Sequence, residues 1–297
     1  MTASSRAGSG FSYAGRKVAV TGCSSGIGQA LAVVLRDRGA TVIGLDRNPP
    51  ATGAVNEFIE IDLADQRSTR HGAEVLTQHG VDRLFNVAGV TGALPPASVI
   101  SINFLGMREL TEIVVAGMRP GGAVVTTAST AASRFASRRE LLAGLLASDG
   151  RAEGLAWCDR NAARLGSGYA LSKDAVVWYT IERAVRLAAR GVRINCVAPG
   201  VTDTPILAAT RAARGDAFLE SIPLPLGRPA LPQEQATVMA FAGSDDAAYL
   251  TGQVLWVDGG YMAGVAAGQI EDRTGAIAEA TPPADQPLAT NHHRSKG

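Results

Sequence analysis

A tyrosine and a lysine stand four positions apart in the sequence Tyr169-Ala-Leu-Ser-Lys173. On an α-helix this spacing puts both side chains on one face, and a neighbouring cation lowers the pKa of a phenol. A tyrosine with a lowered pKa can act as a general acid or base near neutral pH. Only three of the 28 Lys and Arg residues are lysines, which suggests that a compact point charge is needed at Lys173. The pair predicts proton transfer; the alternative is two residues on an exposed helix face.

Ser129 is the second feature with chemical potential. It ends the apolar run from Gly122 to Ser129, which we predict to be a strand in the middle of the sheet. Ligands of open α/β sheets bind at the carboxyl ends of such strands. We therefore expect the Ser129 hydroxyl to hold a carbonyl oxygen close to Tyr169.

A glycine-rich turn follows the first apolar run, from Lys17 to Thr21. Glycines permit a tight turn and let backbone N–H groups approach a pyrophosphate, and the N-terminus of the following helix adds a positive potential. The turn predicts a dinucleotide site made by Gly22, Ser24, Ser25, Gly26, Ile27 and Gly28.

Asp46 ends the second apolar run, from Thr41 to Asp46. A carboxylate at this place can accept hydrogen bonds from both ribose hydroxyls and repels a 2′-phosphate, which favours NAD over NADP. Arg47 tempers this preference because a guanidinium could pair with that phosphate; the alternative is a solvated residue at the end of a strand.

The elements that must position these residues alternate along the chain. Apolar runs alternate with helical patterns, which end at residues such as Gly39, and such strands pair in parallel through right-handed crossovers. We predict one doubly wound α/β (Rossmann) domain over residues 15–262, with a seven-stranded parallel sheet, a flexible start at 1–14 and a flexible tail at 263–297. The further strands are expected at Glu57–Leu63, Asp82–Gly89, Gly122–Ser129, Arg193–Pro199 and Gln253–Asp258, and the further helices at Gly168–Arg190 and Pro232–Gly243.

Composition excludes several classes of protein. Of the 297 residues 46% are hydrophobic and 19% are charged, as in a packed globular chain, and the net charge of +1 offers no field for nucleic acid or anionic lipid. No stretch approaches the roughly 18 apolar residues of a membrane span, so we expect a cytoplasmic protein. The three cysteines and four histidines lack metal-ligand spacing, and we expect no metal.

These motifs together resemble the short-chain dehydrogenase/reductase family. The resemblance rests on Thr21–Gly28, Asn86-Val-Ala-Gly89, Ser129, Tyr169-x-x-x-Lys173 and Pro199-Gly200, in that order, and runs from about Arg16 to Tyr261. The second residue of the family's usual Asn-Asn-Ala-Gly is Val87 here, for which we expect small adjustments around the cofactor at most.

The resemblance implies roles for further residues. Asn103 would hold a water of a proton relay, and Lys173 would also bond the nicotinamide ribose. Asp62 would bond the adenine, Asn86 and Gly89 would line the cofactor, and Thr204 would meet the carboxamide. The remaining residues expected at the cofactor are Leu63, Ala88, Pro199, Gly200 and Thr202.

The spacing of the catalytic residues departs from the family pattern. Ser129 and Tyr169 are 40 positions apart, which is longer than is common in the family and places an insertion at about 133–166. Leucines at helical spacing predict one or two helices over the active-site side of the domain. The alternative is an element that only packs against the rest of the domain. These helices could cover the face that tetramers use, so among homodimer and homotetramer we favour the homodimer.

Within the family the chain is similar to bacterial coniferyl-alcohol dehydrogenases and 3α-hydroxysteroid dehydrogenase/carbonyl reductases, which handle bulky apolar substrates. The segment 205–229, rich in leucine and proline, would close over such a substrate. We expect NAD-dependent oxidation of an aryl or allylic alcohol. The alternatives are a 3α-hydroxysteroid dehydrogenase/carbonyl reductase and, from another class, a non-catalytic dinucleotide sensor, which predicts a damaged catalytic set.

Overall fold

Seven short runs rich in Val, Ile and Leu form the sheet of the computed structural model, which describes residues 10–277. All neighbouring strands pair in parallel, in the order β3-β2-β1-β4-β5-β6-β7. This confirms the predicted doubly wound sheet. The strands are β1 (Lys17–Thr21), β2 (Thr41–Asp46), β3 (Glu57–Glu60), β4 (Arg83–Asn86), β5 (Ala123–Thr127), β6 (Arg193–Pro199) and β7 (Val254–Val257).

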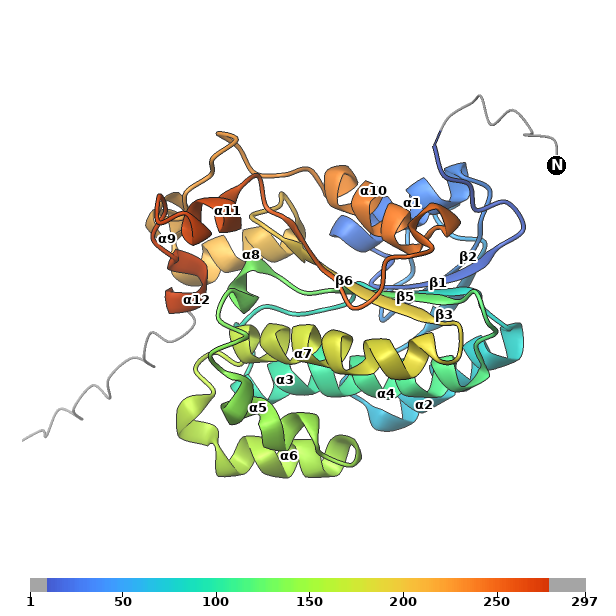
Figure 1. The fold of residues 1–297 in the computed structure, drawn as a ribbon, viewed down its shortest axis with the longest axis horizontal. Helices are drawn as coiled ribbons and strands as arrows, with labels where there is room; N and C mark the ends of the chain where they lie inside the picture. Colours follow the sequence, from blue (N-terminus) through green and yellow to red (C-terminus); the bar gives the residue numbers. More distant parts are fainter. Residues whose placement is uncertain (1–9, 278–297) are drawn as a thin grey trace, which may run out of the picture.

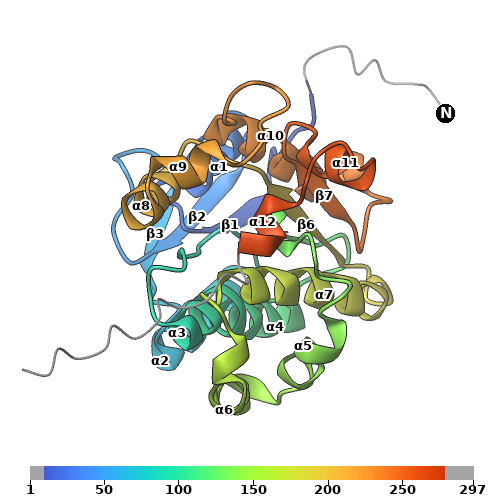
Figure 2. The same cartoon turned by 90° about the vertical axis from the view of Figure 1, so that its left-hand side faces the viewer.

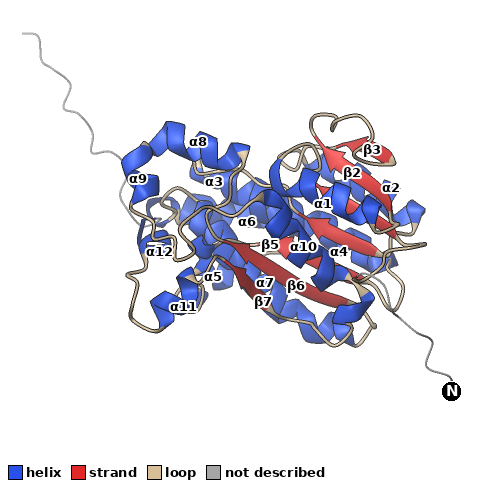
Figure 3. Ribbon diagram, turned by 90° about the horizontal axis from the view of Figure 1, so that it is seen from above, coloured by secondary structure: helices blue, strands red, loops and turns tan. Residues whose placement is uncertain are grey.

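Helices cover both faces of the sheet (Figures 1 and 3). One face is covered by α1 (Gly26–Asp37) and α10 (Pro232–Gly243). The other face is covered by α2 (Gln66–His79), α4 (Met107–Gly117) and α7 (Tyr169–Ala188). The short helix α3 (Pro96–Ile100) leads into α4 through a π-helical turn, η1 (Ser101–Gly106).

The core is divided in two by the sheet, because successive side chains of a strand point to opposite faces. Val18 and Val20 of β1 belong to the apolar cluster under α1 and α10, whereas Ala19 between them belongs to the cluster under α2, α4 and α7. All three are fully buried. Burial on both faces explains why the interior of β1 is uniformly apolar.

The insertion contains two helices, α5 (Arg139–Leu146) and α6 (Gly150–Arg160), followed by a short turn, η3 (Ala162–Arg164). Leu142, Leu145 and Trp157 enter the apolar cluster under α7. Both helices lie on the side of α7 that faces away from the sheet (Figure 1), and neither contributes to the cavity described below. The structure thus corrects the expected placement over the active site and favours the packing alternative.

The two ends of the domain also differ from the predicted boundaries. Tyr13, expected in a flexible start, is 1% exposed and donates a hydrogen bond of 2.6 Å to the carbonyl of Ala240. The predicted domain ended at 262, but the described chain continues through α11 (Tyr261–Ala266) to α12 (Arg273–Ile277). The rest of the expected start and tail, residues 1–9 and 278–297, lies outside the described residues.

Three findings bear on the excluded classes. Between residues 10 and 277, no helix is both long and apolar enough to cross a membrane. Over the same range, no group of His, Cys, Asp and Glu side chains could hold a metal ion. Cys23, Cys158 and Cys196 are buried free thiols.

Candidate active site

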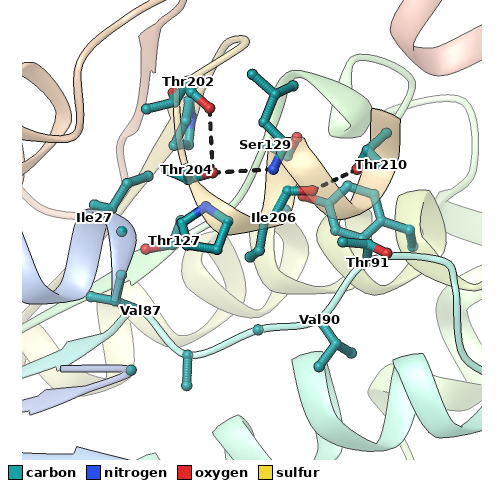
Figure 4. A pocket seen from close by; sticks show the side chains of 18 of the residues that line it. Ile27, Val87, Val90, Thr91, Thr127, Ser129, Thr202, Thr204, Ile206 and Thr210 are labelled. Atoms are coloured by element: carbon teal, nitrogen blue, oxygen red, sulfur yellow. Dashed lines mark hydrogen bonds between the residues drawn. The ribbon is translucent and has the colours of Figure 1, made fainter. Parts of the chain in front are cut away.

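A cavity of about 450 Å³ lies at the carboxyl ends of the strands, and most of the predicted site residues line it (Figure 4). Parallel strands all end at this edge, which brings loops from distant parts of the sequence together. The predicted residues that line the cavity are Gly22, Ser25, Gly26, Ile27, Gly28, Asp46, Asp62, Leu63, Ala88, Gly89, Ser129, Tyr169, Lys173, Pro199, Gly200, Thr202 and Thr204.

The glycine-rich turn between β1 and α1 forms one wall of the cavity. Gly22 has a φ of +73°, and a Cβ on Gly28 would lie 2.0 Å from the carbonyl oxygen of Gly22, so neither position can carry a side chain without a shift of backbone. No side chain caps the N-terminus of α1. Its first backbone N–H groups, beside a cavity, fit the phosphates of a dinucleotide.

Asp46 lies beyond this turn, at the end of β2, and is partly exposed to the cavity. Its Oδ2 accepts a hydrogen bond of 3.2 Å from the backbone N–H of Ser24, and its Oδ1 accepts one of 3.2 Å from that of Asn48. These bonds hold the carboxylate at the rim. Arg47, which is exposed, also lines the cavity, so both residues on which the predicted choice of cofactor depends are present.

Ser129 and Tyr169 meet on the floor of the cavity, Ser129 after β5 and Tyr169 at the first position of α7. Burial raises the pKa of the Tyr169 phenol, and its hydrogen bond with Ser129 partly offsets this rise. The expectation that Lys173 lowers this pKa is therefore wrong for the structure described here. The ammonium is 5.8 Å from the centre of the tyrosine ring, and burial dominates.

Lys173 is 5% exposed, and its Nζ donates a hydrogen bond of 2.9 Å to the carbonyl of Thr127. Burial lowers the pKa of this ammonium to about 8. A Cβ on Gly89 would lie 3.6 Å from Nζ and 3.2 Å from Oδ1 of Asn103. Lys173 and Asn103 thus pack close to Gly89, and a side chain at this position would press against the Asn103 amide.

Three predicted residues do not line the cavity. The Asn86 amide is turned under the floor, where it donates to Thr111 at 2.9 Å, which corrects the expectation that it lines the cofactor. Asn103 holds the backbone of Val90 by bonds of 2.8 Å and 3.0 Å; its part in a proton relay stays a prediction. Ser24 ties the glycine-rich turn to the carbonyl of Asn48.

The predicted lid consists of two helices, α8 (Pro205–Arg214) and α9 (Asp216–Glu220). Thr204 caps α8, since its Oγ1 accepts a hydrogen bond of 3.3 Å from the N–H of Leu207. Figure 4 shows Thr204 and Ile206 beside the cavity. The lid contributes a largely apolar wall formed by Pro205, Ile206, Leu207, Thr210, Phe218, Leu219 and Ile222.

Sequence reasoning missed Thr274, which lines the cavity from beyond the predicted end of the domain. A signal was present: Asp272 caps α12 by accepting a hydrogen bond of 3.0 Å from the N–H of Gly275, and aspartate is typical at this position. Further missed lining residues are mostly small or apolar and include Val90, Thr91, Gly92, Ala93, Ile102, Ala131, Ser167 and Val201.

Two family models match the chain: one described as short chain dehydrogenase over residues 16–139, and one described as enoyl-(acyl carrier protein) reductase over residues 157–262. The coniferyl-alcohol dehydrogenase of Pseudomonas sp. is 35% identical over 82% of this chain and 96% of its own length. The chain belongs to the short-chain dehydrogenase/reductase family. It is therefore an oxidoreductase that acts on alcohols or carbonyl compounds.

Further relatives support this family membership. The 3-alpha-hydroxysteroid dehydrogenase/carbonyl reductase of Comamonas testosteroni is 32% identical over 82% of this chain and 95% of its own length. A solved 3-alpha-hydroxysteroid dehydrogenase from Pseudomonas sp., in complex with NADH, superimposes with a TM-score of 0.75 at 30% identity and covers 86% of this chain and 100% of its own.

A second solved relative contains the other nicotinamide cofactor. It is a putative NAD(P) dependent gluconate 5-dehydrogenase from Beutenbergia cavernae with bound NADP, with a TM-score of 0.65 at 32% identity, and covers 85% of this chain and 99% of its own. A nicotinamide dinucleotide is thus the cofactor class of this short-chain dehydrogenase/reductase.

Proposed function

We propose that this short-chain dehydrogenase/reductase is an NAD-dependent alcohol dehydrogenase/carbonyl reductase for bulky apolar substrates, with aryl or allylic alcohols preferred. The observation that carries the proposal is one continuous cavity with Asp46 at one end, the pair Ser129 and Tyr169 on its floor and an apolar lid above. The end with Asp46 fits a dinucleotide, and the lid fits an apolar substrate.

The reaction follows from the positions of three side chains. When bound, the nicotinamide dinucleotide supplies the acceptor or donor of the hydride. In oxidation the Tyr169 oxygen takes the proton of the alcohol, and Ser129 holds the oxygen as it becomes a carbonyl. Lys173, fixed by Thr127, presents its cation beneath the site. In the reverse direction Tyr169 returns the proton.

The choice of NAD over NADP is supported by Asp46. Its carboxylate lines the cavity and would accept hydrogen bonds from the ribose hydroxyls, whereas a 2′-phosphate in the same place meets a like charge. Arg47 is exposed and lies at the rim. We expect kcat/KM for NAD⁺ to exceed that for NADP⁺, and Asp46→Ala to narrow the difference; Glu60→Ala, at the exposed end of β3, is the control.

The proposed substrate class is tested by NADH formation, followed by absorbance, with coniferyl alcohol, cinnamyl alcohol, secondary benzylic alcohols and a 3α-hydroxysteroid. Fastest turnover of the aryl and allylic alcohols supports the proposal. Turnover of the steroid alone supports the second candidate, a 3α-hydroxysteroid dehydrogenase/carbonyl reductase, which is favoured by the similarity to the solved structure of that name. Absence of turnover with all of them contradicts both.

A further inference from the structure

The segment 269–275, which we call the C-terminal strap, lies next to the catalytic serine. Its helix α12 packs against η2 (Thr130–Ala132), the turn that directly follows Ser129. In Figure 2, α12 lies in front of the carboxyl ends of the central strands. Thr274 of the strap lines the same cavity as Ser129 and Tyr169. A segment distant in sequence thus forms part of the wall beside the reacting groups.

The strap is held by the carboxylate of Asp272. Besides the N–H of Gly275, the carboxylate accepts hydrogen bonds from the Ser133 hydroxyl at 2.7 Å and the Tyr261 hydroxyl at 3.3 Å. Nε of Arg134 lies 3.5 Å away. Burial alone would raise the pKa of this carboxyl, but the hydrogen bonds and Arg134 outweigh it and lower the pKa. Asp272 therefore stays ionised and fixed.

A second attachment ties the strap to the catalytic helix. Nη2 of Arg138 donates a hydrogen bond of 3.2 Å to the carbonyl of Gly275, while its Nη1 lies 2.7 Å from Oδ2 of Asp174. Asp174 is fully buried and directly follows Lys173 on α7. A Cβ on Gly275 would lie 2.3 Å from the Ser133 oxygen, so the strap is packed as closely as its backbone allows.

The side chain of Thr274 can act on a substrate by its shape. Its hydroxyl donates a hydrogen bond of 2.9 Å to the carbonyl of Thr130, which leaves no proton for a ligand. The lid residues Ile206, Phe218 and Ile222 line the same cavity. The wall formed by strap and lid therefore offers a ligand mainly apolar contact and, at Thr274, a hydrogen-bond acceptor but no free donor.

We propose that Thr274 is a specificity-determining residue, and that the C-terminal strap sets the size of the apolar group accepted beyond the reacting carbon. This inference rests on the proposed function, because it concerns the substrate of the same site. A larger residue at 274 would fill the space needed by a ring system of the substrate, and a smaller residue would enlarge that space. Changing a pocket by about one methylene changes kcat/KM by roughly 10- to 200-fold.

The test compares kcat/KM for a small alcohol, 1-phenylethanol, with that for a large one, androsterone. We expect Thr274→Trp to lower the ratio of large to small by at least about tenfold and Thr274→Ala to raise it. The affinity for NADH, measured by fluorescence, stays unchanged in both variants. If the wild type oxidises neither alcohol, the proposed function fails and this inference with it. If it oxidises both and the ratio stays constant in both variants, or if it oxidises one and neither variant changes which alcohol reacts or its kcat/KM, only the inference fails.

The attachment of the strap is tested by a matched pair of neutralised carboxylates. Asp272→Asn removes the charge that holds the strap, whereas Glu271→Gln removes a carboxylate that is 71% exposed and pairs only with Arg273 among the described residues. We expect faster hydrogen exchange over 269–275 and a raised large-to-small ratio in Asp272→Asn alone. Equal exchange and equal ratios in the two variants would overturn the inference. Hydrogen exchange over 269–275 is also measured in Thr274→Trp, to check that the larger side chain leaves the strap docked. If the strap is released in that variant, the large-to-small ratio of Thr274→Ala decides the test.

Discussion

The replacement of Arg151 by methionine tests whether the insertion is an integral part of the domain. Arg151 lies on α6, and its side chain is 5% exposed. Its guanidinium donates hydrogen bonds to the carbonyls of Leu63 at 2.8 Å and Ala64 at 3.1 Å, and to the carboxylate of Glu109 at 3.1 Å. It thereby joins the insertion to α4 and to the loop that carries Leu63 into the cavity.

The magnitude follows from the buried ion pair. Breaking such a pair by removing one partner costs about 3–5 kcal/mol. Glu109 keeps Arg70 at 2.7 Å and Gln66 at 2.9 Å, so we expect the lower end, about 3 kcal/mol. At about 2 °C per kcal/mol for a domain of this size, the melting temperature should fall by about 6 °C.

Arg183→Met is the matched control for Arg151→Met. Arg183 lies on α7 and pairs at 2.7 Å with Glu112, which lies on α4 as Glu109 does. The side chains of Arg183 and Glu112 are 30% and 44% exposed. Such a pair contributes at most about 1 kcal/mol, which corresponds to about 2 °C. Thermal scans of the three proteins measure this, and KM for NAD⁺ should rise in Arg151→Met alone because Leu63 loses its anchor. Equal shifts in both variants would refute the reasoning.

Three further predictions concern the site and the assembly. Ser129→Ala removes the hydrogen bond that lowers the pKa of Tyr169, so the rising limb of kcat/KM for oxidation should move to higher pH; a limb that stays or moves down contradicts this assignment. Gly28→Ala places a Cβ 2.0 Å from the Gly22 carbonyl and should abolish NADH binding, measured by fluorescence, whereas an unchanged affinity would show that the turn does not carry the cofactor. The homodimer stays a prediction; a stable tetramer in light scattering would contradict it.

The parts of the fold that the sequence predicted are those governed by local patterns. The bounds of β6 and α10 agree with the runs Arg193–Pro199 and Pro232–Gly243, because glycine and proline delimit both. The strand expected over Glu57–Leu63 ends at Glu60, where its pairing with β2 ends at Asp46. The motif residues of the cavity were found in the same way, since they lie at the end of a strand, in the turn after it or in the first two turns of a helix.

The remaining features depend on contacts between distant parts of the chain. Thr274 is held at the cavity by the hydrogen bond between Ser133 and Asp272, which are 139 positions apart. No periodic pattern in the sequence of α12 predicts this hydrogen bond. The pKa of Tyr169 follows from its burial in the folded protein, which its spacing to Lys173 does not reveal. The placement of the insertion likewise depends on its partners in the core, such as Trp157 against the cluster under α7.

The most direct test of the proposed chemistry is the replacement of Tyr169 by phenylalanine, which removes only the oxygen that exchanges the proton. Turnover of the best alcohol with NAD⁺ and the affinity for NADH are measured side by side. We predict that turnover falls by at least about 100-fold, as expected for the loss of a general acid or base, while NADH binds as in the wild type. Full turnover in Tyr169→Phe would contradict the assignment of Tyr169 as the group that transfers the proton.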